Sequence, residues 1–133
     1  MNSQKIIFNV ARALAALIML QTLFFKFTGA EESVYIFTKV GMEPYGRIGA
    51  GILELIASVL LFVPNYKWLG ALTGVGLMTG AIVSHLTILG IDVMNDGGYL
   101  FFLAITVLIC CSTSLFLERK NIPILKIVLS EQN

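Results

Sequence analysis

The sequence predicts an all-α integral membrane protein in which four transmembrane helices form one bundle. The 133 residues are 57% hydrophobic and only 13% charged, whereas a soluble domain usually carries about 25% charged residues. Four apolar segments come close to the roughly 20 residues that a helix needs to cross the hydrocarbon core of a bilayer. A chain of this length is expected to form a single domain, here residues 1–133.

The first predicted helix covers residues 6–27 and ends at a Thr-Gly pair, a combination that can stop a helix. Arg12 interrupts its apolar core, so we expect this helix to be retained rather than cleaved as a signal peptide. Residues 31–41 follow, opening with two glutamates and repeating apolar residues at helical spacing. Because this segment is too short to span, we expect a helix that lies in the membrane interface.

The other three spans are expected over residues 45–63, 68–89 and 98–117. A Pro-Asn pair ends the second span, Gly90 can end the third, and a polar loop rich in turn residues leads into the fourth. The tail after Pro123 is apolar again for several residues. It predicts a second interfacial helix or a frayed end.

Lysine and arginine side chains gather at the end of the predicted bundle that holds both termini. They are Lys5, Arg12, Lys67, Arg119, Lys120 and Lys126. The opposite end has Lys26, Lys39 and Arg47, offset by acidic residues. Because positive residues favour the cytoplasmic side of a membrane, we expect both termini in the cytoplasm.

Two ionisable residues lie inside predicted spans, Glu54 in the second and His85 in the third. The helix directions place both in the outer half of the bundle, where Gln21, Lys26 and Arg47 fall at similar depths. An unpaired charge at mid-membrane costs about 2.5–3.5 kcal/mol on insertion scales. We therefore expect Glu54 to face the interior of the bundle, either protonated or paired with one of the three nearby basic side chains.

These five residues are the candidate ligand-binding residues, because ionisable groups inside membrane spans commonly mark functional sites. In this interpretation the site binds a ligand or moves a proton. The alternative is a structural ion pair or hydrogen bond that fixes the register of the helices. A lone histidine does not predict a metal site, and no motif predicts a catalytic residue. The charge pattern gives no reason to expect binding to nucleic acid.

Small residues on the third span predict close packing between helices. The candidates are Gly70, Gly74, Gly76 and Gly80, whose spacing lets helix backbones approach one another in lipid. Two adjacent cysteines lie in the fourth span at positions 110 and 111. Neighbouring residues on a helix point about 100° apart, so a disulfide between them would break the helix. We interpret them as two small buried thiols.

The order of these features resembles the DoxX family of small four-helix membrane proteins, and the resemblance covers all four spans. It consists of an arginine early in the first helix, a lysine and a glycine at its end, a small-residue run leading to an acid, a Pro-bounded turn, and a late histidine. In this sequence these are Arg12, Lys26, Gly29, Gly49-Ala50-Gly51-Ile52-Leu53-Glu54, Pro64, Leu69-Gly70-Ala71 and His85. The family often has a glycine where this chain has Ala50.

The resemblance implies the four-helix fold and a small set of functions. Family members resemble a subunit of a thiosulfate:quinone oxidoreductase, and others are linked to thiol or oxidative-stress systems. Related eukaryotic proteins look like receptor-assembly chaperones and cargo receptors. An oxidoreductase role and a quinone cofactor are therefore implied for this chain by the resemblance alone.

Two functions from different classes follow as expectations. The first is an accessory or quinone-linked subunit of a membrane redox system, with a buried polar site in the outer half of the bundle. The alternative is a non-enzymatic binding or assembly module, in which the polar cluster is structural and the glycine faces dock a membrane-protein partner or a second copy. A small transporter is less favoured, because no span shows a clear break near its middle.

Overall fold

The computed structural model describes residues 2–132, and this part of the chain is all-helical, with six α-helices and no strand. The α-helices are α1 (Ser3–Phe27), α2 (Glu31–Lys39), α3 (Tyr45–Leu60), α4 (Lys67–Ser84), α5 (Tyr99–Leu117) and α6 (Pro123–Glu131). A π-helix, η1 (His85–Leu89), continues α4, and a short 3₁₀ helix, η2 (Arg119–Asn121), follows α5. The predicted all-α class is confirmed.

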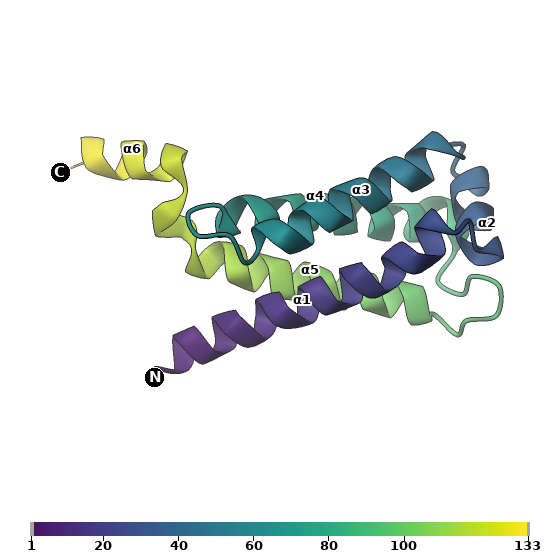
Figure 1. Ribbon diagram of the computed structural model, residues 1–133, viewed down its shortest axis with the longest axis horizontal. Coiled ribbons are helices and arrows are strands. Elements are labelled where there is room, and N and C mark those ends of the chain that lie inside the picture. Colours follow the sequence, from purple (N-terminus) through teal and green to yellow (C-terminus); the bar gives the residue numbers. More distant parts are fainter. Residues whose placement is uncertain (1, 133) are drawn as a thin grey trace.

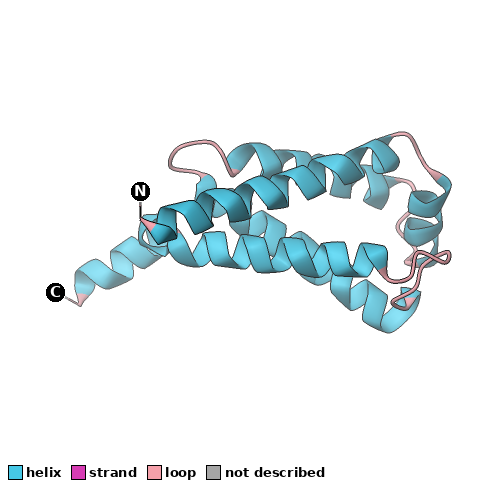
Figure 2. Cartoon of the chain, turned by 90° about the horizontal axis from the view of Figure 1, so that it is seen from below, coloured by secondary structure: helices cyan, strands magenta, loops and turns pink. Residues whose placement is uncertain are grey.

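Four of the helices, α1, α3, α4 and α5, pack against one another as neighbours in the order α1, α3, α4, α5 and back to α1. α1 begins and α5 ends at one end of the molecule, and α6 projects away from that end (Figure 1). α2 lies across the opposite end, hereafter the α2 end (Figure 1). Figure 2 shows that α1 and α5 diverge toward the α2 end.

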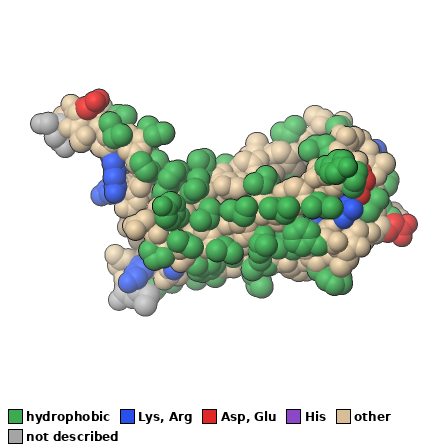
Figure 3. Space-filling model, turned by 45° about the horizontal axis from the view of Figure 1, so that its top comes forward, with side chains coloured by type: hydrophobic (Ala, Val, Ile, Leu, Met, Phe, Trp, Pro, Cys, Tyr) green, Lys and Arg blue, Asp and Glu red, His purple; other side chains and the backbone are tan. Residues whose placement is uncertain are grey.

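Three helical segments are long and apolar enough to cross a membrane: α1, α4 together with η1, and α5. α3 has 16 residues and ends before the predicted position 63, because residues 61–66 form turns instead of helix. On the face shown in Figure 3, hydrophobic side chains cover the middle of the molecule and charged side chains lie toward its ends. These features indicate a membrane protein.

Small residues make the contacts between the packed helices. The most buried alanines, each exposed by 8% or less, are Ala11, Ala15, Ala16, Ala57, Ala71 and Ala104. At Gly70 on α4, an added Cβ would lie 2.7 Å from the backbone N of Leu61 and 2.8 Å from the carbonyl O of Ala57. The α3 and α4 backbones therefore touch beside the turn that joins them, as small residues allow in lipid.

The other glycines of α4 fall into two groups. An added Cβ at Gly74 would lie 2.5 Å from the Sγ atom of Cys111, so α4 and α5 are also close there. Gly76 and Gly80 have no atom within 4 Å of such a Cβ. Among residues 2–132, Gly70 and Gly74 are therefore the two of these four glycines at which another helix approaches closely.

We expect Gly70→Ala to lower the free energy of unfolding by about 2 kcal/mol, because overfilling a close contact forces the backbones apart. Gly76→Ala is the matched control, since its added methyl group meets open space. It should leave stability unchanged or raise it slightly, because alanine is the better helix former. Titrating both variants with a denaturing detergent in mixed micelles measures the difference. Equal stability of the two variants would contradict the backbone contact.

Candidate functional site

An ion pair links α1 to α3 in the half of the molecule nearer the α2 end. Lys26 Nζ lies 3.1 Å from Glu54 Oε2, and the two side chains are only 15% and 7% exposed. The hydroxyl of Thr22 lies 3.2 Å from the same oxygen and 2.9 Å from the carbonyl O of Met19, so its one hydrogen is shared between these two acceptors. Of the three basic side chains expected near Glu54, Lys26 is the one that pairs with it.

A glycine on α3 lets these groups meet. An added Cβ at Gly51 would lie 2.7 Å from the ring of Phe27, so the end of α1 packs directly on the α3 backbone. Lys26 on α1 and Glu54 on α3 lie close to this contact between the two helices. Ser58, one turn further along α3, donates its hydroxyl to the carbonyl O of Glu54 at 2.7 Å. The small-residue run before Glu54 thus brings a lysine from another helix onto a buried acid.

Arg47 belongs to a separate ion pair. Its Nε atom lies 2.8 and 3.0 Å from the two carboxylate oxygens of Glu43, four residues earlier. One of its Nη atoms donates to the backbone carbonyl of Lys26, and its guanidinium lies beside Gly29 just after α1. Arg47 therefore fixes the end of α1, and it does not pair with Glu54.

A cavity of about 420 Å³ lies between the helices at the α2 end, hereafter the interhelical cavity. Four of the five candidate residues line it, namely Gln21, Lys26, Glu54 and His85. Arg47 does not. Most other lining side chains are apolar and come from α1, α2, α4 and α5. The cavity thus combines a few polar groups with apolar walls, which is the usual composition of a small-molecule site.

His85 begins the π-helix and is 5% exposed. Its Nδ1 atom lies 2.9 Å from the carbonyl O of Gly90, and its ring meets that of Phe101 edge to face at 5.6 Å. A carbonyl only accepts hydrogen bonds, so Nδ1 carries the hydrogen. In the neutral ring Nε2 then presents a lone pair, and it has no hydrogen-bond partner within residues 2–132. No hydrogen bond joins His85 to Glu54 in that part of the chain.

α2 adds polar groups that sequence reasoning missed. Glu32 and the buried Ser33 line the interhelical cavity from the α2 end. Burial raises the pKa of Glu32, and the nearby negative charge of Asp96 raises it further. Thr22, the second donor to Glu54, was also missed. The signals were present: Thr22 lies one turn before Lys26, and the apolar residues of α2 recur at helical spacing.

Asp96 organises the loop before α5. Its carboxylate accepts backbone N–H groups of Val93, Gly98 and Leu100 at 3.0, 2.8 and 3.2 Å. Partial burial alone would raise the pKa of Asp96, but these hydrogen bonds to its charged form hold the pKa below its ordinary value. The loop between η1 and α5 is therefore tied by an ionised carboxylate.

We expect Asp96→Asn to lower the free energy of unfolding by about 1 kcal/mol near neutral pH. Because the folded pKa is below the unfolded one, this stabilisation is complete above about pH 4 and is lost as the pH falls through the lowered pKa. Thermal unfolding in detergent at about pH 7 and about pH 3 tests it. The difference between wild type and variant should shrink at the lower pH, and a difference that grows would contradict the assignment.

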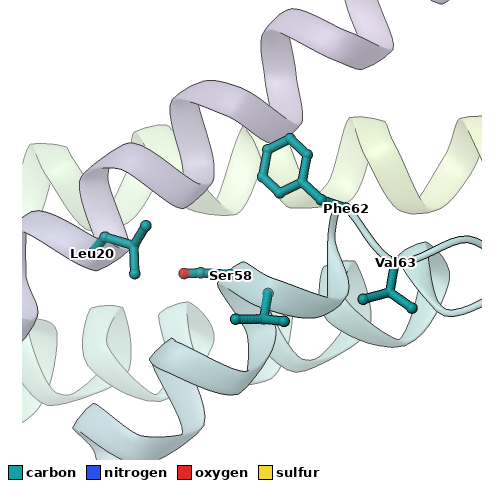
Figure 4. A pocket seen from close by; sticks show the side chains of 5 residues that line it. Leu20, Ser58, Phe62 and Val63 are labelled. Atoms are coloured by element: carbon teal, nitrogen blue, oxygen red, sulfur yellow. The ribbon is translucent and has the colours of Figure 1, made fainter.

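A second hollow lies on the outside of the α1–α3 pair and is lined by Leu20, Ser58, Val59, Phe62 and Val63 (Figure 4). Leu20, Val59 and Phe62 are about half exposed. The hydroxyl of Ser58 is already donated to the Glu54 carbonyl. This hollow has no free polar group to orient a ligand, so it is a surface for acyl chains and not a candidate site.

The cysteines lie apart from the interhelical cavity. Both Cys110 and Cys111 are buried and free, and Cys111 packs against Gly74. Neither lines the cavity. Among residues 2–132, no group of three or more His, Cys, Asp or Glu side chains is arranged to hold a metal ion.

The comparison with protein families gives one match. A model described as the DoxX-like family matches residues 10–111, a stretch that includes most of α1 and of α5 and all the helices between them. The matched stretch contains Lys26 and Glu54, His85 and the cavity-lining part of α2. Neither a curated protein nor a solved structure matches the chain. The chain belongs to the DoxX-like family, and its three long apolar helices indicate that it is a membrane protein.

Proposed function

We propose that this protein binds a lipid-soluble ligand, a quinone or a molecule of similar chemistry, in the interhelical cavity and acts as an accessory subunit of a membrane redox system. One observation carries the proposal: the Lys26–Glu54 pair and His85 line one cavity whose other walls are mostly apolar. Such a cavity suits a ligand with a polar head and an apolar tail. The redox role follows from the family.

The proposal treats α1, α3, α4 and α5 as four spanning helices, with α2 in the membrane interface. The 16 residues of α3 extend about 24 Å, and the apolar residues 61–63 lengthen its hydrophobic stretch toward the ~30 Å of the hydrocarbon core. The lysines and arginines near the termini favour a cytoplasmic position for both termini, and the proposal assigns the protein to the inner membrane of a bacterial-type cell.

Each polar group of the cavity has a role suited to its chemistry. A quinone headgroup supplies two carbonyl oxygens that become hydroxyls on reduction. The ammonium of Lys26 and the amide of Gln21 can donate hydrogen bonds to such oxygens. Glu54 is the proton acceptor or hydrogen-bond partner, with its charge balanced by Lys26. His85 relays a proton through Nε2, because Nδ1 is held by Gly90.

The test is purification in mild detergent, followed by lipid extraction and mass spectrometry. We expect a quinone to copurify, and a quinone with a decyl tail to raise the melting temperature of ligand-free protein. The increase should be smaller in Glu54→Gln. The proposal fails if no quinone copurifies and the added quinone leaves the melting temperature unchanged. An equal increase in Glu54→Gln would remove Glu54 from the site.

A second candidate function is a membrane-protein assembly module, which Gly76 favours because its Cβ position is open and it does not line the interhelical cavity. In this case the ion pair is structural, and the α4 face with Gly76 docks a partner or a second copy of the chain. Crosslinking in native membranes distinguishes the two functions. A stoichiometric partner that is lost in Gly76→Leu, with quinone absent, would favour the assembly module.

A further inference from the structure

We propose that the interhelical cavity opens sideways into the bilayer between α1 and α5, so that its ligand is a tailed molecule that reaches the site from the lipid. This inference rests on the proposed function, and it adds the route of access and a requirement on the ligand. A headgroup beside Lys26 and Glu54 would be joined to an apolar tail that leaves the protein between the two helices.

The exposed members of the cavity lining mark the opening. Phe25 on α1 and Tyr99 on α5 both line the cavity and are 45% and 53% exposed. Gln21, one turn before Phe25, is also exposed. Deeper on α5, Ala104 and Val107 line the same cavity but are buried. On α1 and α5 the lining therefore becomes more exposed toward the gap between these helices. The two other exposed lining residues are Met42, before α3, and Gly80 on α4.

The arrangement of the helices agrees with this opening. α1 and α5 pack against each other along part of their length, and they diverge toward the α2 end (Figure 2). α3 contributes only Ala50 and Glu54 to the lining, whereas α1, α5 and α4 with η1 contribute most of it. The cavity thus lies away from α3, and α1 and α5 are the lining helices that separate.

α2 covers the end of the cavity that would face water. Its lining residues are Glu32, Ser33, Ile36, Phe37 and Val40, and Ser33 is buried. α2 is anchored on both sides, because Arg47 donates to the carbonyl of Lys26 near the end of α1 and to Glu43 in the turn that follows α2. With this end covered, the side between α1 and α5 is the route that a bilayer-dissolved molecule can use.

The chemistry along the route suits a tailed amphiphile. The ion pair and Thr22 lie inside, whereas the rim consists of two aromatic rings and the amide of Gln21. An aromatic rim gives an apolar tail large contact surfaces at its exit. Gln21 can hydrogen-bond a second oxygen of the headgroup as it passes the rim.

The test bridges the opening reversibly in proteoliposomes. Phe25→Cys/Tyr99→Cys receives reducible bis-thiosulfonate crosslinkers of graded length, and the exchange of bound radiolabelled decyl-tailed quinone for unlabelled quinone is followed. One pair serves as the control: Leu20→Cys/Val59→Cys across the outer α1–α3 hollow, because neither residue lines the interhelical cavity. Wild type treated in the same way controls for the native cysteines, both of which are buried.

We expect bridging at positions 25 and 99 to slow exchange by about tenfold or more while equilibrium affinity stays the same, because it closes the path and leaves the headgroup contacts intact. Reduction should restore the rate, and the control bridge at 20 and 59 should not slow it. The inference is overturned if the bridge at 25 and 99 has no effect, or if both bridges slow exchange equally. A quinone that does not bind wild type at all contradicts the proposed function itself.

Discussion

Lys26→Met should lower the free energy of unfolding by about 3 kcal/mol, because it leaves the carboxylate of Glu54 buried without its cation. Glu54 is 5% exposed, and its remaining side-chain partner is the hydroxyl of Thr22. A hydroxyl donates one hydrogen bond and carries no charge. The variant must either keep an unpaired charge inside the helices or protonate Glu54. Titration with a denaturing detergent in mixed micelles gives the free energy.

The double variant Lys26→Met/Glu54→Gln is the control for this prediction. It removes both charges and keeps a side chain of similar size at each position. We expect it to recover most of the lost stability, because a buried ion pair contributes little net free energy compared with a neutral pair. If the double variant is as unstable as Lys26→Met, the loss arises from packing of the lysine stem, and the ion pair is not the cause.

Arg47→Met should cost a similar amount, about 3 kcal/mol, for a different reason. It removes the bidentate contact with Glu43 and the hydrogen bond to the carbonyl of Lys26 at the end of α1. Arg47 is 9% exposed, so the loss leaves polar groups without partners in a buried place. Because the end of α1 also carries Lys26, we expect the affinity for a decyl-tailed quinone to fall as well. Unfolding titration and quinone binding measure the two effects.

Lys39→Met is the matched control for Arg47→Met. Lys39 lies on α2 at the same end of the molecule, but it is exposed and contacts only the hydroxyl and ring of Tyr35. Its loss should change stability by no more than about 0.5 kcal/mol. A loss as large as that of Arg47→Met would show that positive charge at this end of the molecule matters, and not the specific contacts of Arg47.

The sequence was sufficient for the all-helical class and for most helix boundaries. Glu54 and His85 were recognisable because ionisable residues are rare in apolar segments. From the sequence, Lys26 was one of three possible basic partners of Glu54, because the pairing depends on how closely α1 approaches α3. Gly51 decides that distance, but a sequence does not show which neighbouring helix a glycine contacts.

Other features of the site could be recognised in part or not at all. The pairing of Arg47 with Glu43 could have been predicted, because residues four apart on a helix are neighbours. The predicted depth in the membrane favoured Glu54 as the partner of Arg47 instead. The π-helix at His85 has no pattern in the sequence. It arises where the Gly90 N–H bonds to the carbonyl of His85 five residues earlier. The early end of α3 was also missed, because the apolar run continues through residues that form a turn.

The most direct test of the central claim is photolabelling of the purified protein with a decyl-tailed quinone that carries a photoreactive group on its head. We predict that mass spectrometry finds the label on peptides from the cavity wall, between Gln21 and Lys26 on α1 and around Ser84 and His85. Excess unlabelled quinone should prevent this labelling. Labelling confined to the outer α1–α3 hollow around Val59 and Phe62, or labelling that unlabelled quinone does not reduce, would contradict a ligand in the interhelical cavity.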